Sequence, residues 1–358
     1  MLLLRELGDR AGWFSRPGDD YDVAVSSRVR LARNLSVLPF PHEASEDERR
    51  EVVDGVVEAV GKAAAESDNP SDAPFARLEL ADCGPHGPGV LVERNLVSPE
   101  FASGGEGTVI LRNDQESAVT VNDVDHLRII SFKPGRGVAE AYHEADELDR
   151  SLERLLPYAV SIDLGYLTTE LKNLGTGLRA SVMLHLPGLA RKRELQQAFR
   201  ALPETGISVR GFRSRENGSL GDMFQISNQI TLGVSEEEIL AKLEGATQQL
   251  VHYERHARDE LVRQPSVEDR VYRAYGTLAY ARRMSDLEGI EELSWLRFGV
   301  AMGIINAVEL ADATSLFFLS QRSHVTVAAK ESDIPADEGS LDEWRAWIIR
   351  RGLDSDGN

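Results

Sequence analysis

The chain has 358 residues, of which 42% are hydrophobic and 28% are charged, a size and composition typical of a globular protein with one large or two smaller domains. Its formal net charge of −19 argues against nonspecific binding to nucleic acid or membrane surfaces, and no apolar run approaches the ~20 residues that span a membrane. A single cysteine excludes an intrachain disulfide, and the short, charged start MLLLRELGDR is unlike a signal peptide, so we expect a cytoplasmic protein.

The first 235 residues mix predicted strands and helices. Residues 21–35 are predicted as a strand, on which Arg28 and Arg30 share a face because they are two positions apart. Ser45 and Glu48 form a capping box that opens a helix to about residue 65. Further strands are predicted at 76–80, 108–112, 118–121, 127–132, 207–212 and 223–232, and an amphipathic helix at 138–156.

A Gly-Thr-Gly turn at residues 175–177 precedes the apolar run 178–187. Glycines here allow backbone angles and close approaches that a side chain would block. Apolar residues then recur at helical spacing, which predicts a helix with Arg179 in its first turn. A helix N-terminus beside a fixed cation suits a phosphate, but a glycine-rich loop before a core helix fits the same letters.

From residue 236 the pattern is nearly all helical. Ser235 and Glu238 form a second capping box before a long helix that runs toward Arg263 and ends by Pro265. Helices are then predicted at 268–283, 286–296, 298–311 and 344–349, with Ser285 and Glu288 as another capping box. The shift in composition predicts two domains, residues 1–235 and residues 236–358.

Six segments stand in a fixed order along the chain: SSRVRLARNL (26–35), LVERNLVSP (91–99), VNDVDHLRI (121–129), NLGTGLRASVMLHLP (173–187), VRGF (209–212) and FQISNQ (224–229). Together they resemble the ATP:guanidino phosphotransferase (phosphagen kinase) family, most closely the bacterial protein-arginine kinases. The resemblance implies an α+β fold in which helices flank an antiparallel, saddle-shaped sheet. A mostly helical C-terminal domain for dimerisation and regulation would follow.

The resemblance also implies nucleotide binding. Five arginines of the family hold the phosphates, and all five have counterparts here, namely Arg28, Arg30, Arg128, Arg179 and Arg210. The rest of the implied nucleotide-binding set is Ser26, Ser27, Val29, Asn95, Ala180, Ser181, Val182, Met183 and Gly211, with Asn95 where the family has a histidine beside adenine. ATP or ADP would bind with Mg²⁺ held mainly by phosphates and water, so we predict no dedicated metal site.

The acceptor side departs from the family pattern. Val124 and Arg215 stand where the family has the carboxylates that orient and deprotonate the acceptor guanidinium. Losing one such group commonly costs ~2–4 kcal/mol of transition-state stabilisation. Replacement carboxylates are predicted at Asp123, Glu170 and Glu216, which lie beside or in place of lost groups.

The C-terminal segment resembles the family's Arg-Asp-x-x-Arg-Ala motif, which implies a regulatory phosphoarginine pocket. Asp342, Arg345 and Ala346 match it, but Leu341 replaces the first arginine. An ordinary amphipathic terminal helix fits these residues equally well.

Three functions stay open on the sequence. The favoured one is a pseudokinase or impaired kinase that binds ATP or ADP and acts by docking partners. The second is an active ATP-dependent kinase, for protein arginine or another acceptor, with relocated carboxylates. The third is a structural dimer that binds no nucleotide. By resemblance the partners would be a second copy or a related kinase, and protein substrates or protease or chaperone proteins.

Overall fold

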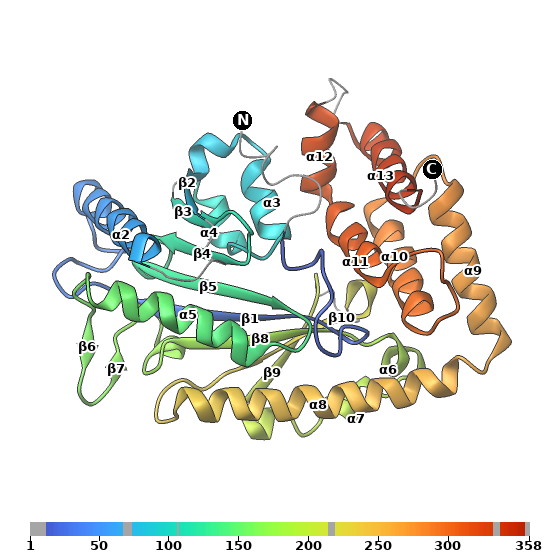
Figure 1. Cartoon of the computed structure of the whole chain (residues 1–358), viewed down its shortest axis with the longest axis horizontal. Coiled ribbons are helices and arrows are strands. Elements are labelled where there is room, and N and C mark those ends of the chain that lie inside the picture. The colour runs from blue at the N-terminus through green and yellow to red at the C-terminus, as the bar shows by residue number, and fades with distance from the viewer. Residues whose placement is uncertain (1–11, 67–73, 106, 214–218, 332–336, 355–358) are drawn as a thin grey trace.

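An eight-stranded antiparallel sheet forms the centre of the computed structural model, which describes residues 12–66, 74–105, 107–213, 219–331 and 337–354 (Figure 1). The strand order is β2-β3-β4-β5-β1-β8-β10-β9. The strands are β1 (Ala24–Arg33), β2 (Phe75–Glu79), β3 (Thr108–Arg112), β4 (Ser117–Val121), β5 (Leu127–Pro134), β8 (Leu178–His185), β9 (Ile207–Gly211) and β10 (Met223–Asn228). A separate hairpin joins β6 (Val160–Ser161) and β7 (Gly165–Tyr166).

Helices α2 (Glu46–Glu66), α5 (Val138–Glu153) and α8 (Glu236–Leu261) cover one face of this sheet. Short helices lie between strands: η1 (Leu80–Cys83), α3 (Gly87–Glu93), α4 (Pro99–Ser103), η2 (Leu171–Asn173), α6 (Pro187–Lys192), α7 (Leu195–Phe199), η3 (Pro203–Thr205) and η4 (Leu220–Asp222). The C-terminal region contains α9 (Pro265–Tyr280), α10 (Asp286–Ala301), α11 (Leu310–Leu319), α12 (Arg322–Glu331) and α13 (Glu338–Leu353). None of the helices in the described ranges is long and apolar enough to cross a membrane.

The predicted α+β architecture is confirmed, and its helix starts follow the predicted caps. Ser45 N–H donates to Glu48 at 2.7 Å, and Glu48 N–H donates back to the Ser45 hydroxyl. Ser285 and Glu288 form the same reciprocal box at the start of α10. These bonds satisfy backbone N–H groups that a helix leaves without a partner.

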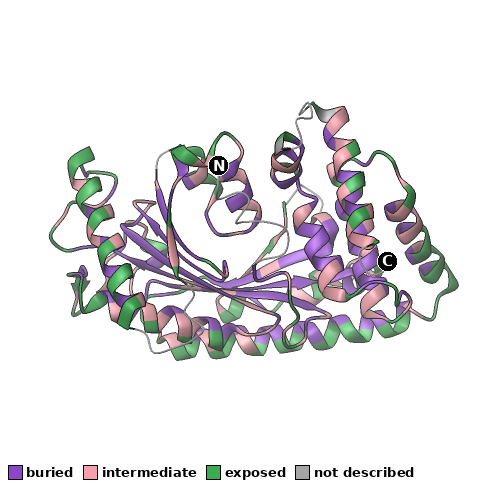
Figure 2. Cartoon of the chain, turned by 45° about the horizontal axis from the view of Figure 1, so that its top comes forward, coloured by how far each residue is buried: buried purple, intermediate pink, exposed green. Residues whose placement is uncertain are grey.

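The central strands of the sheet are almost entirely buried (Figure 2), because apolar side chains pack against helices on one whole face and on part of the other. Alternate residues of β1, β5, β8 and β10 share a core with the inner sides of α2, α5 and α8. Among them are Val29, Leu31, Ile129, Ala180, Val182, Ile226, Val56, Ala145, Leu243 and Leu250. Because side chains alternate along a strand, the intervening residues must face the other way.

The helix predicted at 178–187 is wrong, because residues 178–185 form β8. This strand lies between β1 and β10 and is buried on both faces except at Arg179, so its apolar run does not alternate and resembles a core helix. The glycine prediction is confirmed. Gly175 and Gly177 have φ of 106° and 65°, and a Cβ on Gly175 would lie 2.3 Å from the Thr231 carbonyl oxygen.

The helix break predicted near residue 297 is also wrong. α10 continues through Arg297 to Ala301, and α11 begins only at Leu310. Arg297 is completely buried inside this helix, so its charge does not mark a helix end. The turn comes later, where Gly303 adopts a φ of 69°.

Buried charged groups connect α8 to the end of β8. The Glu254 carboxylate accepts hydrogen bonds from Gly188 N–H at 2.8 Å, Leu189 N–H at 2.9 Å and Arg258 Nε at 2.6 Å. Arg258 donates in turn to the carbonyl of His185 at 2.9 Å. Both side chains are inaccessible to solvent, so each charge depends on the other.

A second buried cation connects α10 to the same place. Arg297 donates to the Asp22 carbonyl at 3.0 Å and to His185 Nδ1 at 2.9 Å. Burial, with the charges of Arg297 and Arg258, holds the pKa of His185 well below its usual value, so the ring is neutral. The ends of β1 and β8 are therefore fixed by helices from the C-terminal half.

Replacing Glu254 with Ala should lower the free energy of unfolding by about 3–5 kcal/mol, because it leaves the Arg258 charge buried without its acid. Asp269→Ala is the matched control, since it breaks an exposed ion pair with Arg273 and should cost less than about 0.5 kcal/mol. Urea denaturation measures both. Equal losses in the two variants would contradict this account of the junction.

Candidate functional site

Five arginines from four strands lie on the sheet face opposite the apolar core. Arg30 stands directly opposite Arg179, and Arg128 stands opposite Ala32, two positions from Arg30. Arg210 on β9 reaches the same face through its pairing with Gln225. Residues paired across antiparallel strands point to the same side, so β1, β5, β8 and β9 present all five guanidinium groups together.

The positive charge of this arginine face is largely unpaired. Arg30 and Arg210 make no hydrogen bond or ion pair with any residue that the structure describes, and Arg28 donates only to the Asn95 carbonyl at 3.3 Å. Burial, followed by the charges of neighbouring arginines, lowers the pKa of Arg30 to about 9 and that of Arg28 to about 10. Crowded, half-buried cations without acids are unfavourable unless an anion joins them.

A small cleft opens beside these arginines. It is lined by Ser26, Arg28, Asn95, Phe132, Ser181, Met183 and Gln225. The structure thus brings together five residues of the predicted nucleotide set. Asn95 adopts a φ of 59°, which turns its backbone carbonyl toward Arg28.

Four other residues of that set do not lie on the arginine face. Val29, Ala180 and Val182 are completely buried in the apolar core on the other side, because they alternate with the arginines and serines. Ser27 faces the same way and bonds to the Gly135 carbonyl at 2.9 Å. The side chains of these four residues therefore point away from the arginine face, and their contact with nucleotide stays a prediction. Gly211 stays beside Arg210 at the end of β9.

Sequence reasoning missed three polar or aromatic residues of this face. Gln225 donates to the Ser181 hydroxyl at 2.8 Å, and Ser227 accepts from Arg179 at 3.1 Å. Phe132 lies under Arg28, with its ring centroid 6.0 Å from the guanidinium carbon. The alternation of side chains within FQISNQ and along β5 was the available signal. It shows which residues share a face of one strand, but only the pairing of the strands shows that this face carries the arginines.

On the acceptor side, Asp123 is committed to an ion pair inside the protein. Its carboxylate lies 2.5 Å from Arg128 Nη1 and accepts the Val124 N–H at 2.8 Å. Burial raises the pKa of Asp123, although the charges of Arg128 and Arg30 oppose this. The side chain is 5% exposed, so it neutralises Arg128 and is not free to hold an acceptor.

Glu170 is the more accessible acid at the edge of the arginine face. Its carboxylate lies 3.9 Å from Arg128 Nη2 and accepts from Lys172 at 2.8 Å. Burial opposes its ionisation, but the bond from Lys172 and the charges of Arg128 and Arg30 hold its pKa below the usual value. The structure therefore brings Asp123 and Glu170 together around Arg128. Glu216 and Arg215 lie outside the described residues.

Asp125 holds the loop that carries Glu170. One carboxylate oxygen of Asp125 accepts from the Asn34 amide at 2.9 Å and from Thr169 N–H at 2.8 Å. The next residue, His126, accepts the Leu35 N–H at Nδ1 and bonds to the Pro39 carbonyl at Nε2. This pattern places the ring proton on Nε2 of a neutral imidazole, and burial lowers the His126 pKa accordingly. Asp125 and His126 position the site.

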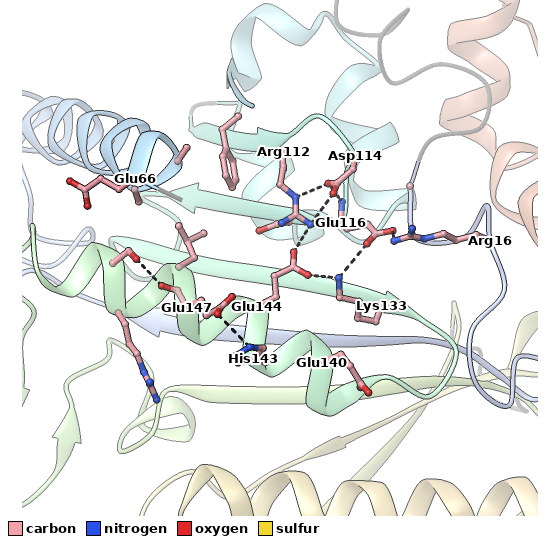
Figure 3. A pocket seen from close by; sticks show the side chains of 18 of the residues that line it. Arg16, Glu66, Arg112, Asp114, Glu116, Lys133, Glu140, His143, Glu144 and Glu147 are labelled. Atoms are coloured by element: carbon pink, nitrogen blue, oxygen red, sulfur yellow. Dashed lines mark hydrogen bonds and ion pairs between the residues drawn. The ribbon is translucent and has the colours of Figure 1, made fainter. Parts of the chain in front are cut away.

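A larger groove of about 1150 Å³ lies on the other side of the sheet, beside α5 (Figure 3). Its floor is a row of alternating charges. Lys133 contacts Glu116 at 3.5 Å and also pairs with Glu144, which in turn pairs with Arg112. Because these charges neutralise one another, the groove lacks the unbalanced positive charge of the arginine face.

The C-terminal motif residues are used within the protein. Arg345 donates to the Ser320 carbonyl at 2.9 Å, the Met284 carbonyl at 2.8 Å and Asp342 at 2.9 Å. Leu341 and Ala346 are buried. A phosphoarginine would have to compete with these bonds, so the geometry favours a role in fixing α13.

The arginine face suits a polyphosphate. Charge-assisted hydrogen bonds from guanidinium groups to phosphate oxygens would relieve the repulsion between cations. Among the described residues, no group of three or more His, Cys, Asp or Glu side chains is placed to hold a metal ion.

Comparison with known proteins decides the family. A family model described as ATP:guanido phosphotransferase, C-terminal catalytic domain, matches residues 55–257, more than half of the chain. The chain belongs to the ATP:guanido phosphotransferase family. A second family model, described as Protein-arginine kinase McsB C-terminal domain, matches residues 264–358.

Within this family the chain is similar to protein-arginine kinases over almost its whole length. It is 38% identical to the enzyme of Pelotomaculum thermopropionicum, over 98% of each chain. It is also 38% identical to that of Halothermothrix orenii, over 95% of this chain and 96% of the other. The resemblance predicted from the sequence motifs is thus confirmed.

Solved guanidino kinases share the fold. Taurocyamine kinase from Schistosoma mansoni aligns with a TM-score of 0.56 at 23% identity, over 69% of this chain and 35% of that chain. Lombricine kinase aligns with a TM-score of 0.54 at 22% identity, over 69% and 72%. These structures support the sheet architecture on which the phosphotransferase-family arginines are arranged.

Asp125→Ala should lower the free energy of unfolding by about 2–3 kcal/mol, because the Asn34 amide and the Thr169 N–H lose their acceptor. Hydrogen exchange at Thr169 should also accelerate. Asp163→Ala, at an exposed position, is the control and should stay within about 0.5 kcal/mol of the parent. Unchanged protection of Thr169 would show that Asp125 does not hold this loop.

Proposed function

We propose that this chain binds ATP or ADP on its five-arginine face and transfers the phosphoryl group poorly or not at all. The observation that carries this proposal is the half-buried set of cations for which the described protein provides too few acids. Asn95 and the adjoining cleft would take the adenosine end. The wider proposal is an impaired protein-arginine kinase or pseudokinase that works through nucleotide binding and partner docking.

The acceptor side supports the second half of this proposal. Val124 has no group that could hold a guanidinium, and the carboxylate of Asp123 is already paired with Arg128. An acceptor nitrogen needs to be oriented and to lose a proton as it attacks phosphorus. Carboxylates provide both through bidentate hydrogen bonds, and these two positions provide neither.

A second candidate, an active kinase with a relocated carboxylate, is favoured by the place of Glu170. This half-exposed acid lies at the edge of the arginine face, 3.9 Å from Arg128. It would orient the guanidinium and take its proton while the new nitrogen–phosphorus bond forms and ADP leaves. The protein-arginine kinases that are 38% identical make protein arginine the first acceptor to test.

Other features belong to the proposal as well. We expect a cytoplasmic protein that forms a homodimer or pairs with a related kinase, and that meets protein substrates or protease or chaperone partners. The division into residues 1–235 and 236–358 is a prediction of the same kind, although α8 packs its apolar side into the core of the sheet.

Arg30→Ala should weaken binding of Mg²⁺–ATP and Mg²⁺–ADP about 10- to 100-fold, because it removes charge-assisted bonds to phosphate. The unfolding temperature of the nucleotide-free variant should hold or rise, because the variant removes repulsion from Arg28, Arg128 and Arg179. Calorimetry measures binding, with Arg273→Ala on an exposed helix face as control. A parent protein that gives no heat with either nucleotide would support the structural-dimer function instead.

Transfer from radiolabelled ATP to an arginine-rich protein separates the two candidates. If Glu170 is the acceptor carboxylate, Glu170→Gln should reduce transfer at least about 100-fold and leave the nucleotide dissociation constant within about twofold. Glu153→Gln, an exposed acid that bonds to Tyr166, is the control. Absence of transfer by the parent protein would favour the pseudokinase, and full activity of Glu170→Gln would eliminate Glu170.

A further inference from the structure

Exposed apolar side chains gather at one end of the sheet, next to Glu170. Of thirteen large hydrophobic residues that are exposed in the described part of the chain, six lie there: Val160, Ile162, Leu164, Leu171, Ile230 and Leu232. We call these six the apolar rim. Ile162, at the tip of the β6–β7 hairpin, is fully exposed, and Leu171 is 84% exposed. A gathering of this kind marks an interaction surface more often than scattered single residues do.

Three contacts hold the rim together. Tyr166 of β7 pairs with Gly175, with a Tyr166 N–H to Gly175 carbonyl distance of 2.8 Å. The Thr231 hydroxyl, between Ile230 and Leu232, donates to the carbonyls of Lys172 and Leu174 at 3.1 and 2.8 Å. The segment 170–175 therefore lies between the hairpin and residues 230–232. The hairpin itself projects from the end of the molecule near α5 (Figure 1).

The rim is continuous with the acceptor side of the arginine face. Leu171 directly follows Glu170, and the same loop is held to Asp125 through Thr169. Acidic residues stand among the apolar ones, with Asp163 exposed at the hairpin tip and Glu153 bonded to Tyr166. These acids could attract a cationic segment, although Lys172, bonded to Glu170, also lies here.

We propose that the apolar rim binds the residues that flank an arginine in an extended polypeptide, so that the site prefers arginines in apolar sequence surroundings. This inference rests on the second candidate of the proposed function, because it places the arginine side chain at Glu170. Alternate side chains of an extended segment point to one side, so residues two and four positions from the arginine could reach the hairpin or residues 230–232. The contacts would bury apolar surface that is now in water.

Fluorescence anisotropy with two labelled 11-residue peptides tests this. Both have a central arginine, and the residues two and four positions away on each side are Leu in one and Ser in the other. With Mg²⁺–ADP present, the Leu peptide should bind about tenfold more tightly or better. Ile162→Glu combined with Leu171→Glu should bring its affinity down to that of the Ser peptide, with unchanged ADP affinity and unfolding temperature.

Tyr280→Glu, at an exposed apolar position on α9, is the matched control and should change neither peptide. Equal affinities for the two peptides, or a preference that survives the double substitution, would overturn the inference. The inference would also be overturned if the double variant changed only the oligomeric state, measured by sedimentation, because the rim would then be an interface between copies of the chain. If the parent protein binds no ADP but still prefers the Leu peptide, the proposed nucleotide binding is refuted and the peptide preference stands.

Discussion

Repulsion between guanidinium groups on one face of the sheet is the constraint around which the site is built. Strand alternation produces it, because Val29 and Leu31 face the core while Arg28 and Arg30 face the other way. Asp123 compensates Arg128, and among the residues that the structure describes most of the remaining charge has no acid beside it. Crowding these guanidinium groups disfavours folding, but it places positive charge where a polyanion could bind without further rearrangement. A preorganised phosphate site has this property.

The rest of the fold keeps these cations in place. The guanidinium group of an arginine is positioned more precisely when its backbone lies in a central strand than when it lies in a loop. The ends of β1 and β8 are fixed further by the buried bonds of Arg258 and Arg297 to Asp22 and His185. The helices of the C-terminal half thus help to fix the arginine face indirectly. The bonds of Arg258 and Arg297 hold the strand ends and do not contact the five arginines.

Local signals predicted much of the fold, because capping boxes, alternation and turn glycines act over a few residues. Ser285, Gly175 and the strands around Arg28 and Arg128 follow from such signals. β8 did not, since a central strand that is buried on both faces carries no alternation to read. The place of Glu170 beside Arg128 could not be predicted either. It depends on Asp125 holding a loop 44 residues away in the sequence, which no local pattern reveals.

The two halves of the site are built from different parts of the fold, and this explains why they depart unequally from the family pattern. Four of the five arginines on this face lie in strands whose register is fixed by both neighbours, where a slip of one residue would turn every side chain to the other face. Val124 and Glu170, at positions proposed to face the acceptor, lie on connecting segments, where substitutions disturb the sheet little. A change of acceptor, or its loss, therefore costs the fold little, whereas losing the arginine face would require rebuilding the sheet.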